Sequence, residues 1–381
     1  MDNLTHSLVG LAAAKAGLER VSPYATLTCI VAANLPDIDI VTLAGGPAAY
    51  LANHRGITHS LVGALALALA LPVLFVGGER LFARLRGREP RARFKGLLVC
   101  SLLLVASHPL LDWTNSYGLR PFLPWDGRWV YGDLLYIIDP WIWLTLGGAC
   151  FLLTARTRPR ALAWAALACV LSLLFVLFQR RPDAWPPVVA LAVWFGGLAL
   201  FFALHLSGLA KRGGERVAVV SLALVALYCC ALALFHHAAL TDSRRAAQGL
   251  AAQGGERVLR VAATPVLADP LAWRCLAETD RATFRFDLTL GEQDAAENPR
   301  GLLRVEKPLG AERALVERAS ADERARVLLG FARFPVARVL PQQGGAALVR
   351  FADLRFTEPG ARARPGGFAL DVPVSDAAAR P

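Results

Sequence analysis

Long apolar stretches dominate the first 240 residues of the chain. A helix needs about 20 mainly apolar residues to cross the hydrocarbon core of a bilayer, where it must satisfy its own backbone hydrogen bonds. The stretches that qualify are 58–78, 95–112, 136–155, 160–179, 186–206 and 216–237. Two others, near 4–18 and 23–35, are shorter and are expected to form a helical hairpin packed against the spans. The sequence therefore predicts a mostly α-helical integral membrane bundle of about six spans plus an N-terminal helical hairpin.

Residues 241–381 have a different composition. They hold 21 Lys+Arg and 18 Asp+Glu, whereas the longer segment 1–240 holds only 20 and 12. Their β-like runs are separated by Gly and Pro and read RATFRFDLTL, RVLLGFARFPVARVL, ALVRFADLRF and GFALDVPV. Such runs are typical of short strands. We expect a C-terminal soluble β-rich or α+β domain, preceded by a polar linker near 241–256.

The lysines and arginines of the first 240 residues predict an orientation. Residues 79–95 carry seven basic and two acidic side chains between two apolar runs, and basic loops stay in the cytoplasm. Counting spans places the basic segments 156–160 and 211–216 on the same side, although Arg180 and Arg181 fall on the other. We therefore expect a multi-pass protein of the bacterial inner membrane, with the domain 241–381 outside the cytoplasm.

Composition also excludes some classes of function. The net charge is +11, but the excess lies in short loops, and residues 241–381 carry only +3 (21 minus 18). No basic stripe with interleaved aromatic residues occurs, so no nucleic-acid partner is expected. The seven cysteines contain no CxxC pair, and the N-terminus lacks the basic region of a cleavable signal peptide.

One heptad is written almost identically twice, as LTHSLVG at 4–10 and ITHSLVG at 57–63. Each copy precedes an apolar helical pattern, so Thr5 and Thr58 are expected to cap the two helices through their hydroxyl oxygens. Capping explains the threonine but not the histidine that follows it. His6 and His59 are therefore expected to serve a common site.

Two further patterns contain ligand-type side chains. NLPDIDI places Asp37 and Asp39 two residues apart, and SHPLLDW places His108 and Asp112 four apart, on one face of a helix. Ionisable residues inside an apolar run are costly and usually functional. His205, His236 and His237 are interpreted as ordinary interfacial residues. At or near the expected outer face lie His6, His54, His59, His108, Asp2, Asp37, Asp39, Asp112, Asp126, Asp133, Asp139 and Asp183. Imidazole and carboxylate ligands suit Zn, Mn or Fe.

The motifs LTHSLVG, NLPDID, HRGITHS, SHPLLDW and YGLRPFLP with IIDP occur in order over residues 1–140. In this the chain resembles the YdjM-type family of membrane-bound metal-dependent hydrolases, which is distantly similar to zinc-dependent phospholipase C and single-strand nucleases. The resemblance implies metal binding by His6, Asp37, His59, His108 and Asp112, with His54, Asp39 and Asp139 as further ligands or neighbours. Because no histidine follows His108 before His205, one or two metal ions are expected rather than three.

These observations divide the chain into three regions. They are a metal-site region at 1–140, additional transmembrane helices at 141–240, and a soluble domain at 241–381. The function expected is hydrolysis of a lipid or membrane-associated phosphoester by metal-activated water. Asp39 or Asp139 would accept the proton of the water. Arg55 would either hold a phosphate or anchor at the headgroup level. Two alternatives stay open: a metal transporter or sensor, and a non-catalytic assembly protein.

Overall fold

The computed structural model describes residues 1–179, 187–208, 213–297, 299–342, 347–360 and 367–374. The chain divides into two compact units. The first unit comprises Met1–Ile38, Arg55–Leu234 and Pro265–Pro270, and the second comprises Asp39–His54, Phe235–Thr264 and Leu271–Pro381. Four residues on which the expected orientation partly depends lie outside the described residues: Arg180, Arg181, Lys211 and Arg212. Asp183, which was expected at or near the outer face, also lies outside them.

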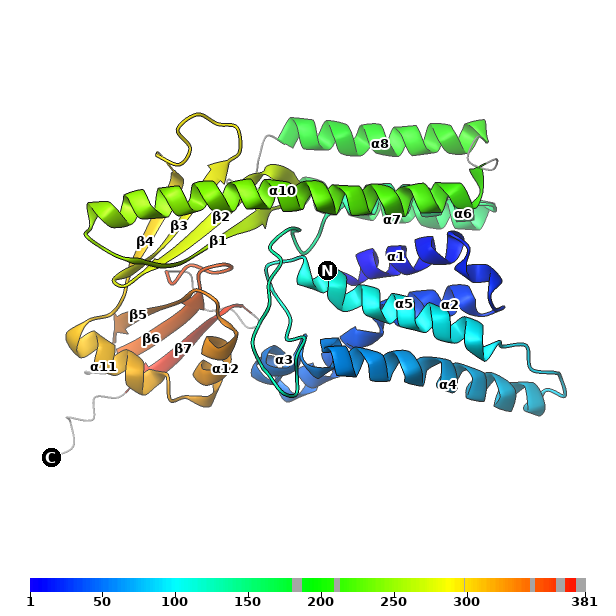
Figure 1. Ribbon diagram of the computed structural model, residues 1–381, viewed down its shortest axis with the longest axis horizontal. Helices are drawn as coiled ribbons and strands as arrows, with labels where there is room; N and C mark the ends of the chain where they lie inside the picture. Colours follow the sequence, from blue (N-terminus) through cyan, green and yellow to red (C-terminus); the bar gives the residue numbers. More distant parts are fainter. Residues whose placement is uncertain (180–186, 209–212, 298, 343–346, 361–366, 375–381) are drawn as a thin grey trace. The chain divides into compact units, whose positions relative to one another are not determined.

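The first unit is a bundle of helices (Figure 1). The expected N-terminal hairpin is present as α1 (Asn3–Lys15) and α2 (Ala25–Asn34), which continues into the 3₁₀ turns η2 (Leu35–Gly45). The other helices are α4 (Leu61–Leu85), α5 (Phe94–Trp113), α6 (Pro140–Thr154), α7 (Arg158–Gln179), α8 (Pro187–Ser207) and the long α10 (Glu215–Gln253). Helix α1 packs against α2 and α6, and α5 packs against α2 and α4.

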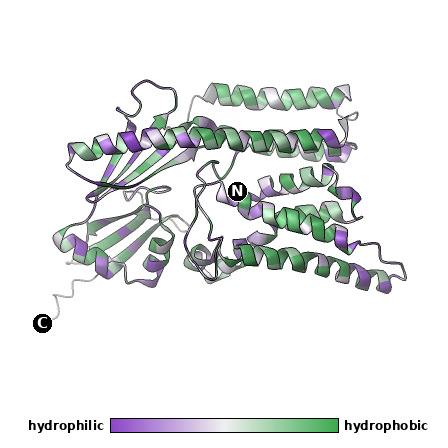
Figure 2. Cartoon of the chain, in the orientation of Figure 1, coloured by the Kyte–Doolittle hydropathy of each residue, from purple (hydrophilic) through white to green (hydrophobic). Residues whose placement is uncertain are grey.

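Six helices of the described residues are long and apolar enough to cross a membrane, as expected, but the set differs in one member. They are Ala25–Gly45, Leu61–Leu85, Phe94–Trp113, Arg158–Leu177, Val189–Ser207 and Glu215–Gln253. The stretch 23–35 was judged too short, but it is prolonged by η2. The stretch 136–155 was expected to span, yet only Pro140–Thr154 is helical because Asp139 caps the helix. Figure 2 shows that most residues of these helices are hydrophobic.

Small residues allow the ligand-bearing helices to approach closely. A Cβ atom at Gly10 of α1 would lie 2.7 Å from the carbonyl oxygen of Cys29 in α2. Ala14, Ala25, Ala32 and Ala33 of this pair are fully buried. Small residues at helix contacts are the usual solution in membranes, where packing replaces the hydrophobic driving force. The hairpin is thereby fixed against α5.

The expected threonine caps are wrong for both helices. Helix α1 begins at Asn3, so its cap is Asp2, whose carboxylate accepts the N–H of Thr5 at 3.0 Å. Before α4 the chain makes the single 3₁₀ turn η3 (Ile57–His59), which moves the cap from Thr58 to Ser60. The Ser60 hydroxyl accepts the N–H of Gly63 at 3.1 Å. The repeated heptad therefore starts its two helices at different positions.

The second unit contains two antiparallel sheets, which confirms the β-containing domain. One sheet has the order β1-β2-β3-β4, formed by Val258–Val266, Asp269–Thr279, Ala282–Thr289 and Arg300–Glu306. The other has the order β5-β6-β7, formed by Pro335–Pro341, Ala347–Asp353 and Ala369–Val374. The helices α3 (Pro47–Asn53), α11 (Gly310–Ala319) and α12 (Glu323–Phe331) complete the unit, and all three contribute to the packing around β5–β7.

Two expectations about this region need correction. The polar linker expected near 241–256 is helical as far as Gln253, because Ala246 and Ala247 of α10 are buried against Trp273 and other residues of the first sheet. The run RVLLGFARFPVARVL is not one strand. Its first part belongs to α12, capped by Asp322, and only the part from Pro335 onward is β5.

Candidate metal centre

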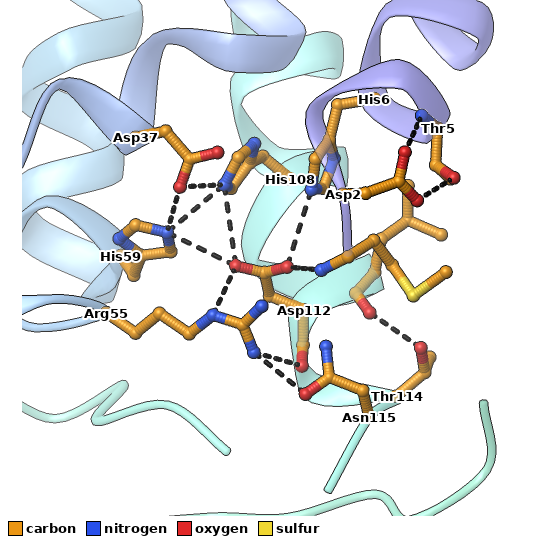
Figure 3. Close-up of polar contacts among 12 residues, drawn as sticks. Asp2, Thr5, His6, Asp37, Arg55, His59, His108, Asp112, Thr114 and Asn115 are labelled. Atoms are coloured by element: carbon orange, nitrogen blue, oxygen red, sulfur yellow. Dashed lines mark hydrogen bonds and ion pairs between the residues drawn. The ribbon is translucent and has the colours of Figure 1, made fainter. Parts of the chain in front are cut away.

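Five of the predicted ligands meet at one end of the helical bundle, delivered by four segments (Figure 3). His6 comes from α1, Asp37 from η2 and His59 from η3. His108 and Asp112 lie one turn apart on α5, as their spacing predicts. The three imidazoles and Asp112 are buried, and Asp37 is partly exposed. We call Asp37, His59, His108 and Asp112 the metal cluster, because one donor atom from each lies within 4.8 Å of the others.

Five of the six distances among the donor atoms of the metal cluster are close to the edges of a tetrahedral site. The Nε2 atoms of His59 and His108 are 3.1 Å apart. Asp37 Oδ1 lies 3.4 Å from each of them, and Asp112 Oδ2 lies 3.2 Å from His59 and 3.5 Å from His108. Donors at about 2.0–2.1 Å from a central metal form a tetrahedron with edges of about 3.3–3.4 Å. The residues present therefore fit a divalent ion such as Zn²⁺.

Hydrogen bonds on the far sides of the rings orient the donor atoms. His108 Nδ1 donates to the carbonyl oxygen of Ala33 at 2.7 Å, which leaves Nε2 of the neutral ring as a lone-pair donor. His59 Nδ1 lies 3.0 Å from the hydroxyl of Thr58. Metal-binding histidines are typically fixed by such partners. The second threonine of the repeated heptad thus contacts the ring that it precedes, although it caps no helix.

His6 lies beside the metal cluster rather than within it. Its ring stacks on that of His108, with centroids 3.8 Å apart and planes inclined by 17°. Its Nε2 lies 3.4 Å from Asp112 Oδ1, the oxygen opposite the one that faces His59. Burial lowers the pKa of His6 to about 3, so the ring is neutral at physiological pH. Among the described residues neither ring nitrogen makes a hydrogen bond, and His6 therefore offers a further lone pair at this site.

The guanidinium of Arg55 contacts the buried carboxylate of Asp112. Its Nε lies 3.0 Å from Asp112 Oδ2, and its Nη1 donates to Asn115 Oδ1 at 2.8 Å. The guanidinium also lies over the ring of Tyr117, 4.8 Å from its centroid. Arg55 has φ +54°, a left-handed conformation that brings this side chain inward. Only 2% of the residue is exposed, so it is not an anchor at the headgroup level.

Asn115 is a site residue that the sequence reasoning missed. Its side chain is buried and also accepts the backbone N–H of Tyr117 at 2.9 Å. The sequence feature that could have identified Asn115 is its position three residues after Asp112, just beyond the end of α5. A polar residue buried there needs hydrogen-bond partners. The backbone nitrogen of Met1 contacts Asp112 Oδ1 as well. One carboxylate therefore stands at the centre of almost every contact in the site.

Asp39 and His54 belong to the second unit, where they form a pair. His54 Nδ1 lies 2.9 Å from Asp39 Oδ1, and the His54 ring stacks on Tyr50 with centroids 4.6 Å apart. Asp39 is buried. A carboxylate that orients an imidazole in this way is common in proton-transfer sites.

Asp139 is the N-cap of α6. Its Oδ1 accepts the N–H groups of Trp141 and Ile142 at 2.9 and 3.0 Å, and its Oδ2 accepts the hydroxyl of Tyr228 at 3.1 Å. Burial raises the pKa of Asp139 to about 6, against these hydrogen bonds. The cap gives the carboxylate a structural role in the first unit.

Two of the three histidines interpreted as ordinary, His205 and His236, have aromatic neighbours. His205 packs against Phe151, and His236 packs against Trp273, with ring centroids 4.7 and 5.5 Å apart. Neither belongs to the metal cluster.

Comparison with known proteins supports the family resemblance. Residues 1–182 match the family model described as YdjM inner membrane protein. The uncharacterized protein YfhP of Bacillus subtilis (strain 168) is 30% identical over 155 residues, which is 38% of this chain. The chain spans less than half, 44%, of the length of that relative. No solved structure matches the chain. The YdjM resemblance expected from the five motifs is therefore confirmed for the first part of this multi-pass membrane protein, and this part contains the metal cluster.

Proposed function

We propose that the YdjM-like part of the chain binds a divalent metal ion at the metal cluster and uses it to hydrolyse a phosphoester of a lipid or membrane-associated substrate. The observation that carries the proposal is the convergence of two imidazole nitrogens and two carboxylates, 3.1–3.5 Å apart in five measured pairs. Without a metal ion, the two imidazole lone pairs and the carboxylates would face one another in a buried site, which is costly. Zinc fits this donor set best, and Mn or Fe would also be held.

A bound divalent metal would supply a water of lowered pKa and polarise a phosphoryl oxygen. The residues of the chain would provide the rest. Arg55 and Asn115 orient the carboxylate of Asp112, and Thr58 and the Ala33 carbonyl orient the two imidazoles. Asp37 is the partly exposed member of the metal cluster, so the substrate would approach from its side. His6 would serve as an additional ligand if a second ion binds.

In this proposal the proton acceptor is Asp39 or Asp139. The carboxylate oxygens of Asp139 are engaged by the α6 backbone and by Tyr228. Asp39 is paired with the imidazole of His54. Arg55 already contacts Asp112 and Asn115. Its main role is therefore to position Asp112, and holding a phosphate is secondary.

The test is metal analysis of the purified full chain together with a screen for metal-dependent phosphoesterase activity on phospholipids in nanodiscs. We expect bound metal and activity in the natural chain and loss of both in His59→Ala. The control is His205→Ala, which alters a histidine that packs against Phe151 outside the metal cluster. Bound metal without any hydrolysis would favour the structural or transport alternatives, and absence of metal from the natural chain would remove the proposal.

We further propose that 79–95 is cytoplasmic and that the second unit is extracytoplasmic. This orientation requires the short apolar helix Pro140–Thr154 to cross the membrane together with the six longer helices. Support comes from the basic residues of 79–95, which connects α4 and α5 at the end of the first unit opposite to the metal cluster (Figure 1). Basic connections of this kind stay in the cytoplasm. An impermeant thiol reagent should label Gln253→Cys but not Glu89→Cys in intact cells, in a chain whose native cysteines are replaced by Ala. The reverse pattern would invert the orientation without affecting the metal cluster.

A further inference from the structure

The connection between α5 and α6 lies at the end of the bundle that holds the metal cluster (Figure 1), and it contains large exposed apolar residues. Phe122 is 47% exposed and Trp125 is 79% exposed. A soluble surface rarely leaves a tryptophan this open, and neighbouring exposed apolar side chains mark a contact surface. These two residues belong to a short turn, 121–126, which has no role in the metal cluster.

This turn is well ordered by its own hydrogen bonds. The carbonyl oxygen of Phe122 accepts the N–H groups of Trp125 and Asp126, both at 3.0 Å. The carboxylate of Asp126 accepts the backbone N–H of Arg128 at 2.9 Å and its Nε at 2.6 Å. The two apolar side chains are therefore presented by a folded element.

The turn is tied to the beginning of a candidate membrane span. The N–H of Leu61, the first residue of α4, donates to the carbonyl oxygen of Pro121 at 3.0 Å. Leu61 and Leu65 of α4 are themselves exposed, which continues the apolar surface from the turn onto the span. Tryptophan is enriched where a span leaves the hydrocarbon core, because its ring is apolar and its N–H is polar.

The same connection also contacts the site. The N–H of Arg120 donates to the carbonyl oxygen of Arg55 at 3.3 Å, and Arg55 Nη1 donates to the Gly118 carbonyl at 3.5 Å. Arg55 in turn contacts Asp112. Only a few residues therefore separate the exposed turn from the metal cluster.

We infer that residues 121–126 form an interfacial turn that contacts the phospholipid bilayer, with Phe122 and Trp125 at the boundary between headgroups and acyl chains. The occupant of this surface is lipid rather than a protein partner, because the surface continues onto α4, a candidate span. The turn places the edge of the site against the membrane. A lipid substrate would then reach the metal cluster from the bilayer, and this last step alone rests on the proposed function.

The test is photo-crosslinking of the full chain in phospholipid nanodiscs, with p-benzoylphenylalanine replacing Trp125. Leu74, 71% exposed within α4, is the positive control, and Leu309, 78% exposed in the second unit, is the matched negative control. We expect a phospholipid adduct at Trp125 at least about fivefold above that at Leu309, since interfacial tryptophan contacts acyl chains. A yield equal to that at Leu309, or crosslinking to a second copy of the chain, would overturn the inference.

A second measurement avoids the bulky photo-reactive group. Bromine atoms near the glycerol end of the acyl chains quench interfacial tryptophans more than bromines near the methyl end. The difference in fluorescence between the natural chain and Trp125→Phe reports Trp125 alone. This Trp125 fluorescence should be quenched more by bromines near the glycerol end than by bromines near the methyl end. No difference in quenching between the two proteins would contradict bilayer contact. Neither measurement involves metal or hydrolysis, so the inference can fail while the proposed function survives, and the reverse also holds.

Discussion

Asp353 in the second unit and Asp112 in the first are both buried carboxylates, but their surroundings differ in kind. Asp353 Oδ2 receives Nη2 and Nε of Arg355 at 2.6 and 2.9 Å, and Oδ1 receives the backbone N–H of Arg355 at 3.1 Å. The guanidinium lies over the rings of Phe331 and Phe356. Donors and charge are matched, as a buried ion pair requires.

Asp112 has one guanidinium neighbour, and the groups around it offer more lone pairs than hydrogen-bond donors can satisfy. Three imidazole nitrogens lie within 3.5 Å of its oxygens, and His59 and His108 bring Asp37 to the same place. Arg55 and the Met1 nitrogen are the basic groups in contact with Asp112. The contrast teaches that burial of charge alone does not mark a site. A metal site is marked instead by buried lone pairs that point at one another, because only a cation or protons can satisfy them.

The largest effect expected from the difference between the two carboxylates is a loss of metal when the first unit is altered. His108→Ala should lower metal affinity by more than the about 10–100-fold that loss of an outer partner costs. The reason is that Nε2 of His108 is a donor within the tetrahedral arrangement. His236→Ala, which alters a ring packed on Trp273, should leave the metal content unchanged. Metal analysis of both proteins after identical dialysis gives the answer, and equal metal content would remove the site as described.

The corresponding change in the second unit should affect stability and not metal. Arg355→Met leaves Asp353 buried without its cation and should cost about 3–5 kcal/mol. The double variant Arg355→Met/Asp353→Leu should recover much of that loss, because it removes both charges. Thermal unfolding in detergent and metal analysis of the same samples would compare the two. A change in bound metal in Arg355→Met would show that the two carboxylates are not independent.

Asp139 is a third buried carboxylate, with neutral donors only, and it should make stability depend on pH. Its pKa is raised to about 6 by burial, above the value near 3.8 of an exposed carboxyl group. The folded chain therefore holds the proton longer, and this stabilisation is complete below about pH 4 and is lost as pH rises through about 6. A shift of this size corresponds to about 3 kcal/mol. The melting temperature of Asp139→Asn should vary less than that of the natural chain between pH 4 and 7; parallel profiles would refute the assignment.

The smallest expected effect is a difference in stability between substitutions at Thr58 and at Ser60, which both precede α4. Ser60→Ala removes the helix cap and should cost about 1 kcal/mol. Thr58→Val removes only the partner of His59 Nδ1 and should destabilise less, while it weakens metal binding. The sequence predicted Thr58 as the cap. Thermal unfolding of both variants would show which residue caps α4. A larger loss of stability in Thr58→Val would identify Thr58 as the cap, as the sequence predicted.

Much of the membrane unit follows from the sequence, because the bilayer imposes a local rule of length and apolarity. The exceptions have local causes. The η2 turns lengthen the segment after α2, and the Asp139 cap shortens the one at α6. The second unit was harder to predict, because a strand and a helix can share one apolar run, as α12 and β5 do in 326–340.

The sequence by itself determined that His108 and Asp112 share a helix face, since that depends only on the helical period. The repeated heptad, through its resemblance, also identified His6 and His59. Only the tertiary structure decided that His59 and Asp37 meet that pair while His6 stacks beside it. Only the structure revealed Asn115 and the inward Arg55. Their arrangement depends on how segments far apart in the chain pack together, and no local pattern encodes the distance between them.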